Sequence, residues 1–547
     1  MLDARTIDAL FPADLPEPAH WEQRYPPRDL PAGAQVTRLA PSPTGFVHIG
    51  GIYAGLINRE VAHRSGGRYL VRVEDTDRSR QVDGASAQFD RAFDYFGLAA
   101  DDAAAIGDYG PFLQSARQEI YLSYVRELLR TGLGYLCFAT PEELADARRR
   151  QEEAKVPTGY YGDWAIWRNA DAEDVAAKLA EGAPYVVRFR SPAVPGARRA
   201  FTDAIRGRLE HEDNRNDVVV LKSSDSALRL PTYHFAHVVD DHLMRVGLVI
   251  RGEEWISSVP VHLQLFEALG FEPPHYAHIA PLMKQIAGGK RKLSKRKDPE
   301  STVDFYLGEG YPAEAVLYYL RGLANGRLAE LPLAEALQEP IRLEECGVAG
   351  PLVDLVKLES ISADHIATLS SEQIFDAVRT WAVAYDADLV PVLDAEPALA
   401  LASLDVERVA VDNPRKDLRK WADFRSTYGF FFPQLFTPVA AGDERLGGLD
   451  TDLVRAFAKD FAAQYEELDA PQAWFDQIRM LAAQHGFAPT PKEFKKNPDA
   501  YPGSIREASQ LVRVALTGST RSPDLFAVAR ALGRAEVLRR VGALSGS

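Results

Sequence analysis

The chain has 547 residues, 46% of them hydrophobic, which predicts several domains with sizeable cores. It contains two cysteines, Cys137 and Cys346, and no apolar run long enough to cross a bilayer, which argues against a disulfide framework and a membrane span. The formal net charge of −15 excludes a uniformly basic nucleic-acid binder, and residues 1–31 lack a secretory pattern, so we expect a cytoplasmic protein.

The first segment, residues 1–34, contains six prolines together with Phe11, Trp21 and Tyr25. No clear periodicity runs through it, which predicts an extended arm. We expect this arm to pack on the domain that follows, with a flexible tail as the alternative.

The next segment is typical of a strand, a turn of small residues and a helix. The strand is expected at 36–40, and the turn Pro-Ser-Pro-Thr-Gly-Phe-Val-His-Ile-Gly-Gly occupies 41–51. Apolar spacing from 52 to 61 predicts a helix, which Ser-Gly-Gly at 65–67 should end. Such a turn lets backbone approach a phosphate, and His48 can donate a hydrogen bond to it. Taken alone, the pattern fits a purely structural turn equally well.

A second strand is expected at residues 68–73, with Glu74-Asp75-Thr76-Asp77 at its carboxyl end. In open parallel sheets that end is where ligands bind. Apolar spacing then predicts helices at about 87–96 and 118–129, which we interpret as packing elements.

The sequence changes character between Cys137 and Lys222. A charged helix is expected at 141–154, and short strands at 185–190 and 217–222. This mixed region differs from the alternation of strands and helices on either side of it.

Alternating strands and helices return near Ser223. The expected elements are a buried strand at 246–251, a helix at 256–269 closed by Gly270, and a final strand at 276–283. A basic loop follows, in which seven Lys or Arg residues and no acidic residue lie between Lys284 and Lys297. The acidic chain therefore has a local basic face, for which a solvated surface is the simplest alternative.

The rest of the chain, from about Tyr311, is predicted to be helical, with breaks at 469–471 and 489–502. We interpret Phe430-Phe431-Phe432 as part of a core rather than a platform for stacking RNA bases.

Two distant stretches resemble the signature motifs of class I aminoacyl-tRNA synthetases. His48-Ile49-Gly50-Gly51 matches the HIGH motif, and Lys292-Leu293-Ser294-Lys295-Arg296, here the KLSKR segment, matches the KMSKS motif. Further matches narrow the resemblance to the glutamate–tRNA ligase family: residues 37–45, 72–77, 231–241 and 249–255. The resemblance extends from about residue 36 to 320 and returns at 513–533.

This resemblance implies an α/β fold: a Rossmann-like class I synthetase catalytic domain with an inserted acceptor-binding domain, followed by an all-α C-terminal anticodon-binding region. The expected parts are an N-terminal extension (1–34), the first half of the catalytic domain (35–136), the inserted domain that grips the acceptor end of tRNA (137–222), the second half with the KLSKR segment (223–310), a helical stem-contact region (311–395) and the anticodon-binding region (396–547).

The resemblance also implies the site residues. The catalytic set is His48, Lys292 and Lys295. The ATP-binding set is Thr44, His48, Gly50, Gly51, Glu254, Trp255, Leu282, Met283, Ser294 and Lys295. The glutamate-binding set is Arg38, Ala40, Ser42, Glu74, Tyr233, His237 and Arg251, in which the arginine forks would meet carboxylates. Many relatives have asparagine where His237 stands, and Asp240 and Asp241 are expected to organise the site.

The implied reaction begins with attack of the glutamate α-carboxylate on the α-phosphorus of ATP. Such a displacement needs positioning and charge stabilisation but no nucleophilic side chain. Mg²⁺ is the expected companion of the phosphates. Some family members carry zinc through a Cys-x-Cys pair, but Cys137-Phe138-Ala139 supplies one cysteine there, so structural zinc is not expected.

The leading hypothesis is ATP-dependent ligation of L-glutamate to tRNA(Glu) through a glutamyl-adenylate, by a monomer without membrane association. One alternative is a non-discriminating enzyme that also charges tRNA(Gln). Another is a tRNA-binding regulatory paralogue without catalysis, against which the intact motifs weigh. A truncated paralogue that glutamylates a modified tRNA base would lack the helical region after Tyr311.

Overall fold

The computed structural model describes residues 2–43, 45, 47–77, 85–101, 108–409 and 411–546. The chain forms two compact units: Met1–Phe305 with Leu317–Asp354, and Tyr306–Val316 with Leu355–Ser547. Among the described residues, none of the helices is both long and apolar enough for a membrane span.

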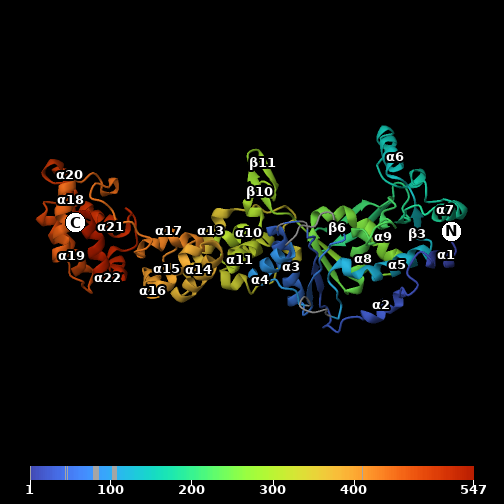
Figure 1. Cartoon of the computed structure of the whole chain (residues 1–547), viewed down its shortest axis with the longest axis horizontal. Coiled ribbons are helices and arrows are strands. Elements are labelled where there is room, and N and C mark those ends of the chain that lie inside the picture. Colours follow the sequence, from blue (N-terminus) through green and yellow to red (C-terminus); the bar gives the residue numbers. More distant parts are fainter. Residues whose placement is uncertain are drawn as a thin grey trace. The chain divides into compact units, whose positions relative to one another are not determined.

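The first unit is built on parallel strands from distant parts of the sequence (Figure 1). β1 (Val36–Leu39) pairs with β2 (Arg68–Val71), and β8 (Leu248–Gly252) pairs with β9 (His275–Ile279). The Gly247 amide donates to the Val36 carbonyl over 3.0 Å and so joins the two pairs. α3 (Ile49–Arg64) packs against β1, β2 and β8. The βαβ unit predicted around the glycine-containing turn is confirmed.

Three helices of this unit lie where the apolar spacing predicts them: α4 (Ala85–Tyr95), α5 (Gln118–Arg130) and α9 (Val259–Leu269). The unit also contains α8 (Tyr233–Leu243), which the spacing did not predict, and the short α12 (Leu333–Ala336). Gly270 ends α9 in the left-handed conformation, with φ of +71°, as the sequence predicts.

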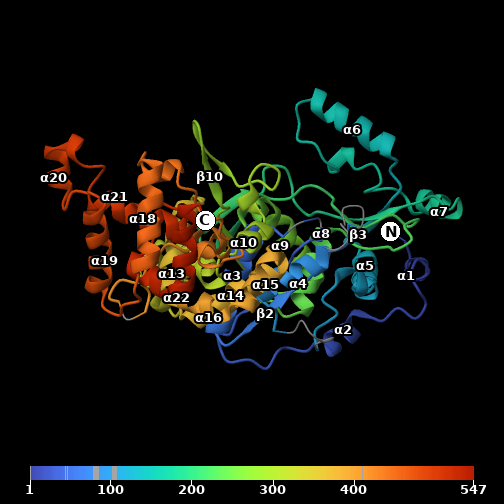
Figure 2. The same ribbon diagram turned by 60° about the vertical axis from the view of Figure 1, so that its left-hand side comes forward.

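The region from 137 to 222 contains an antiparallel sheet of β3 (Gly134–Cys137), β4 (Val186–Phe189) and β7 (Val219–Leu221). α6 (Pro141–Glu153) begins at a capping box, α7 (Ala172–Ala180) follows, and α6 extends away from the strands in both views (Figures 1 and 2). The predicted helix and strands are confirmed. A hairpin of β5 (Arg198–Asp203) and β6 (Gly207–Glu212) was not predicted, because its many charged residues give a weak apolar signal.

The N-terminal segment departs from the expected extended arm. It contains α1 (Ala4–Asp8), which begins at the Asp3 cap, and α2 (Pro18–Arg24), which begins at a proline. Trp21 donates to Ser123 of α5 over 2.9 Å, and Tyr25 is buried in the core that α5 shares. The segment packs on the first unit as expected, but as short helices rather than as an extended or flexible chain.

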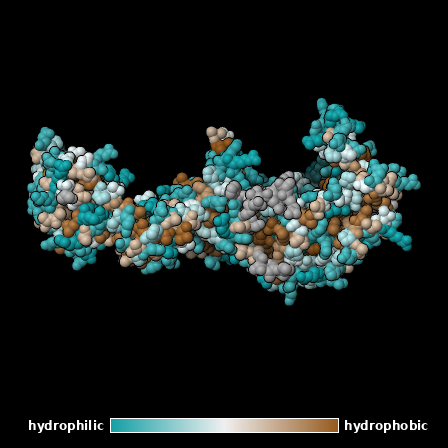
Figure 3. Space-filling view, viewed as in Figure 1, coloured by the Kyte–Doolittle hydropathy of each residue, from teal (hydrophilic) through white to brown (hydrophobic). Residues whose placement is uncertain are grey.

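The predicted final strand, 276–283, is also corrected. β9 stops at Ile279, and Pro281, which has no amide hydrogen, separates it from β10 (Met283–Ile286). β10 and β11 (Gly289–Lys292) form an antiparallel hairpin, so much of the expected basic loop is strand. In Figure 3 the hairpin tip is hydrophobic, and Ile286 is 40% exposed.

All the named elements among the described residues of the second unit are helices, joined by loops. Its helices include α13 (Leu355–Ala367), α14 (Ser371–Tyr385), α15 (Val390–Ala395), α16 (Pro397–Asp405), α17 (Phe424–Tyr428), α18 (Thr451–Gln464), α19 (Pro471–Gln484), α20 (Pro491–Lys496), α21 (Ile505–Thr517) and α22 (Leu525–Gly542). α10 (Val303–Glu309) and α11 (Ala313–Ala324) span the limits between the units. Phe431 and Phe432 are fully buried in one core with Trp474, which confirms their interpretation as core residues.

Candidate active site

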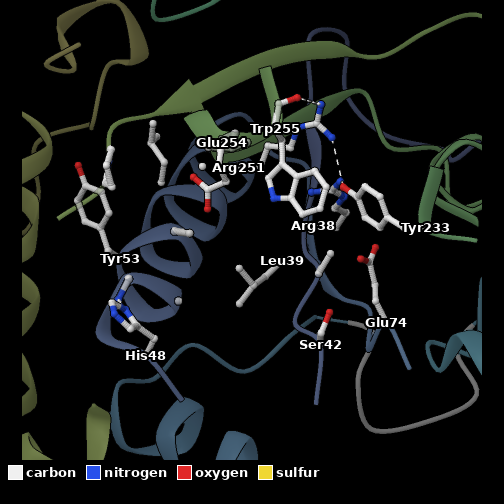
Figure 4. Close-up of a pocket in the computed structure, with 18 of the residues that line it drawn as sticks. Arg38, Leu39, Ser42, His48, Tyr53, Glu74, Tyr233, Arg251, Glu254 and Trp255 are labelled. Carbon is white, nitrogen blue, oxygen red and sulfur yellow. Dashed lines mark hydrogen bonds between the residues drawn. The ribbon is translucent and has the colours of Figure 1, made fainter. Parts of the chain in front are cut away.

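A pocket of about 890 Å³ lies at the carboxyl ends of β1 and β8 (Figure 4). Its wall combines the turn after β1, the start of α3, the end of β8 and the segment that follows β9. The site therefore occupies the edge at which parallel sheets bind ligands.

His48 caps the start of α3 on one side of this pocket. Its Nδ1 accepts a hydrogen bond from the Gly50 amide at 2.9 Å, which leaves the ring proton on Nε2. A Cβ at Gly50 would stand 2.9 Å from that nitrogen, so glycine permits the close approach. Burial, and then the positive charge of Lys295, lower the pKa of His48 to about 4. The imidazole is neutral near pH 7 and can donate from Nε2 to an anion.

The KLSKR segment lies against the His48 turn. The charges of Lys295 and Lys292 lower the pKa of the His48 ring and the Leu293 backbone raises it, which shows that the segment lies close to the imidazole. Lys292 lines the pocket, and its amine is 3.3 Å from Glu254 Oε1. Two stretches that are distant in sequence thus meet at one cavity, with Lys292 in its wall and Lys295 close enough to influence His48.

Asp298 fixes the base of the KLSKR segment. Its carboxylate accepts two hydrogen bonds from Arg291, at 2.6 and 2.8 Å, and one from the Ser294 amide at 2.9 Å. The Lys284 amine lies 3.2 Å away. The Arg291 guanidinium, more than any other group, holds the pKa of Asp298 well below its usual range. The segment is therefore pinned to the hairpin by an ionised carboxylate.

Arg38 extends from β1 into a network of buried charges. Its Nε donates to Asp241 Oδ1 over 3.2 Å, and the same oxygen accepts from Arg72 over 2.5 Å. Arg72 also donates to Glu74 over 3.0 Å. Although burial raises the pKa of Asp241, the Arg38 and Arg72 guanidiniums hold it below its usual range. The His237 Nδ1 lies 3.2 Å from Arg38 NH2 and 3.1 Å from Asp241 Oδ2.

Arg251 reaches the pocket from β8, and uncharged groups surround it. Its Nε donates to His278 Nε2 at 3.1 Å, NH1 to the Tyr233 hydroxyl at 3.3 Å, and NH2 to the Trp255 carbonyl at 3.3 Å. Figure 4 shows the last two contacts and the Trp255 ring beside Tyr233, at a centroid distance of 4.4 Å. The arrangement presents a cationic fork beside the paired rings of Tyr233 and Trp255, which suits a carboxylate-bearing ligand.

Three comparisons with known proteins bear on this site. The family of class I tRNA synthetases (E and Q), catalytic domain, matches residues 35–345, and an anticodon binding domain family matches residues 504–544. A glutamate–tRNA ligase from Clostridium beijerinckii is 39% identical over 95% of each chain, and one from Acetivibrio thermocellus is 39% identical over 98% of each. A crystal structure of a glutamate tRNA ligase from Elizabethkingia meningosepticum, in complex with its amino acid, is 25% identical, with a TM-score of 0.76 over 93% of this chain and 98% of that one.

The chain belongs to the glutamate–tRNA ligase family. The predicted fold class is confirmed: a Rossmann-like class I synthetase catalytic domain is followed by an all-α C-terminal region that carries the anticodon-binding match. The match to this family extends along nearly the whole chain, so it covers both the pocket and the helical region.

Most residues that the family resemblance implied lie on one pocket wall. They are Arg38, Ala40, Ser42, His48, Gly50, Gly51, Glu74, Tyr233, Arg251, Glu254, Trp255, Leu282 and Lys292. His237, Met283, Ser294 and Lys295 are not on this wall, and Thr44 lies outside the described residues. His237 is fully buried against Arg38 and Asp241, which favours an indirect part in the site.

Polar residues of the wall that none of the predicted site sets contains include Tyr53 and Lys222. Tyr53 follows the HIGH motif by less than two turns of α3, so helical spacing could have indicated it. Lys222 comes directly after β7, and its amine donates to the Thr76 carbonyl. Its place at the end of a predicted strand is a signal, although the predicted domain limits put it in the inserted domain.

The surroundings of Cys137 do not fit a structural zinc ion. Its sulfur lies 3.4 Å from the Tyr160 hydroxyl and 3.3 Å from Arg188 Nε, so a phenol and a cation occupy places where further ligands would stand. The described residues contain no cluster of three or more His, Cys, Asp or Glu side chains that could hold a metal.

Proposed function

We propose that this chain activates L-glutamate with ATP and transfers it to tRNA(Glu). The observation that carries the proposal is the convergence of the HIGH and KLSKR motifs on a pocket that also contains Arg38 and Arg251. One end of this pocket offers donors for phosphates, and the other offers guanidinium groups for a dicarboxylic amino acid.

At the amino-acid end, Arg38 and Arg251 meet the carboxylates of glutamate, and Glu74 holds its α-amino group. Glu74 is buried, which raises its pKa, whereas the guanidiniums of Arg72 and Arg38 lower it. An incoming ammonium group adds positive charge beside Glu74 and favours its ionised form. Ser42 and Tyr233 complete the walls around the side chain.

At the nucleotide end, His48 donates from Nε2 to a phosphate oxygen, and Lys292 and Lys295 offset the negative charge that develops on the phosphates. None of these three residues has to transfer a proton, because the glutamate carboxylate displaces pyrophosphate from the α-phosphorus of ATP. Glu254, Trp255 and Leu282 border the adenosine. Mg²⁺ would take its ligands mainly from phosphates and water, since no cluster of acidic side chains among the described residues forms a cage for it.

Glutamate-dependent ATP–pyrophosphate exchange tests the activation step, measured with and without tRNA. Charging of tRNA(Glu) and tRNA(Gln) in parallel then tests transfer and measures discrimination between the two tRNAs. We expect exchange and charging of tRNA(Glu). Absence of both from folded protein would contradict the proposal and favour the non-catalytic alternative.

The domain limits, the cytoplasmic location and the monomeric state given above stay predictions.

A further inference from the structure

Arg251 is a buried cation whose described hydrogen-bond partners are all uncharged. The residue is 6% exposed, and besides His278, Tyr233 and Trp255 it approaches His262 Nδ1 at 3.4 Å from both NH1 and NH2. A buried charge is costly unless it is paired, so this position favours an anionic ligand.

The contact with His278 defines which way the guanidinium faces. His278 Nδ1 lies 2.6 Å from Asp203 Oδ2, and a carboxylate can only accept, so the ring proton is on Nδ1. Nε2 then carries a lone pair, which accepts the Arg251 Nε hydrogen at 3.1 Å. Arg251 and His278 are register partners on the parallel strands β8 and β9, which places both side chains on the same face of the sheet.

Asp203 is itself held rigidly. Its Oδ1 accepts from the amides of Ile205 and Arg206 at 3.0 and 2.9 Å in the β5–β6 turn, and from the His278 amide at 3.3 Å. The carboxylate and the imidazole are fully buried, so water does not compete for these bonds. Burial lowers the pKa of His278, and Asp203 opposes this effect only in part, which is consistent with a neutral ring.

With Nε occupied by His278, the NH1 and NH2 end of the fork is what remains for a ligand. The contacts of that end are long, at 3.3 to 3.4 Å, so a substrate carboxylate can replace them with shorter charged bonds. If the guanidinium could rotate freely, its fixing in one orientation on ligand binding would cost free energy and weaken binding of the carboxylate.

We propose that Asp203 and His278 form a positioning dyad that orients Arg251 toward the side-chain carboxylate of glutamate. The proposal rests on the function given above. It places a specificity element of the amino-acid pocket on the β5–β6 hairpin, within the segment that we assign to the inserted domain. Neither member of the dyad touches the substrate, so both act through Arg251.

Asp203→Asn is the sharpest variant. The asparagine side chain keeps an oxygen that accepts from the backbone amides of the β5–β6 turn. Its NH2 group, however, faces His278 Nδ1, so Nδ1 has to accept a hydrogen bond instead of donating one. The ring proton moves to Nε2 and opposes the Arg251 Nε hydrogen. We expect the KM for glutamate to rise about 10- to 100-fold, as for loss of a hydrogen bond to a charged group, while the KM for ATP changes less than about twofold.

His278→Ala and His278→Gln form a rescue pair. Glutamine can supply an oxygen to Arg251 Nε, so its KM for glutamate should lie between those of the wild type and the alanine variant. His275→Gln is the matched control, because His275 is on the same strand but exposed, and it should leave both KM values unchanged.

Exchange assays and thermal unfolding of the full chain separate the outcomes. Equal rises in both KM values, or no rise for glutamate in folded Asp203→Asn protein, would overturn the dyad. An equal rise in the KM for glutamate in His278→Gln and His278→Ala would also overturn the dyad. Failure of the wild type to catalyse exchange would instead reject the proposed function on which the dyad rests.

Discussion

The two arginines of the pocket are balanced in different ways. Arg38 is paired with Asp241, within a network in which Arg72 also joins Asp240 and Glu74. Arg251 is held by a histidine, a hydroxyl and a carbonyl. Both are almost fully buried, at 2% and 6% exposure, so burial alone does not separate them.

From this difference we infer which arginine contributes more to ligand affinity. The charge of Arg38 is already compensated, and a ligand must share it with Asp241. The charge of Arg251 is not compensated by its described partners, so a carboxylate there gains a full ionic interaction. We therefore expect the Arg38 side to be important chiefly for stability and the Arg251 side chiefly for glutamate recognition.

The largest expected effect follows from removing the centre of the Arg38 network. Arg72→Met leaves the buried Asp240, Asp241 and Glu74 carboxylates short of a counter-charge, which should reduce the free energy of unfolding by about 3–5 kcal/mol. Chemical denaturation measures this change. A loss below about 1 kcal/mol would show that the network does not stabilise the unit.

Arg251→Ala should lower kcat/KM for glutamate about 100- to 1,000-fold, roughly 3 to 4 kcal/mol, with the KM for ATP nearly unchanged. The free energy of unfolding should stay the same or rise, because an unpaired buried cation is removed. Arg251→Lys is the matched control: it keeps the charge without the fork and should recover part of the loss. A stability loss comparable to that of Arg72→Met would erase the contrast between the two sides.

Arg38→Ala should reduce both the free energy of unfolding and the kcat/KM for glutamate. We expect the first loss to be smaller than in Arg72→Met and the second to be smaller than in Arg251→Ala. We expect kcat/KM for glutamate to fall about 30- to 100-fold, far more than for ATP, since one carboxylate contact is lost. Unfolding should also become easier, because Asp241 loses a partner. Equal losses of kcat/KM for glutamate and for ATP would show that Arg38 does not bind the glutamate carboxylate.

Lys295→Ala tests the opposite end of the pocket, where neither arginine acts. We expect glutamate activation to slow about 10- to 30-fold in rapid-quench experiments, less than for a fully buried donor because Lys295 is exposed to solvent. Glutamate affinity should remain nearly intact. Lys297→Ala, a change at an exposed neighbour, is the control, and an unchanged rate in Lys295→Ala would reject the role given to the KLSKR segment.

The smallest effect concerns His237, which contacts Arg38 and packs on His262 beside Arg251. Burial lowers the pKa of His237 well below its ordinary value of 6.5. The unfolded chain therefore binds the proton first, so stability is full above pH 6.5 and is lost as pH falls toward the folded-state pKa. His237→Asn should remove up to about 1.4 kcal/mol per pH unit from this slope between pH 6.5 and 5. An unchanged slope in denaturation curves would show that His237 does not titrate in this way.

Local patterns in the sequence were enough to single out the motif residues that line the pocket. His48 and Gly50 belong to one short turn, whose glycine, helix start and histidine can be recognised from adjacent residues. Arg38 and Arg251 each lie on a strand that the apolar pattern predicts, and the family resemblance implied that both belong to one glutamate-binding set.

The supporting contacts could not be predicted, because they depend on strand register. Asp203 meets His278 only because β5 and β9 run in parallel with Asp203 beside Tyr276, and nothing near Asp203 in the sequence specifies that register. The N-terminal helices were missed for a different reason. They are short, and packing on α5 stabilises them more than their own periodicity does.

A crystal structure with a non-hydrolysable glutamyl-adenylate analogue tests the central claim most directly. We predict that the side-chain carboxylate lies at NH1 and NH2 of Arg251, with the adenylate phosphate near His48 and the KLSKR segment. An analogue bound with its carboxylate away from both arginines, or with its phosphate in a different cavity from His48, would contradict the account.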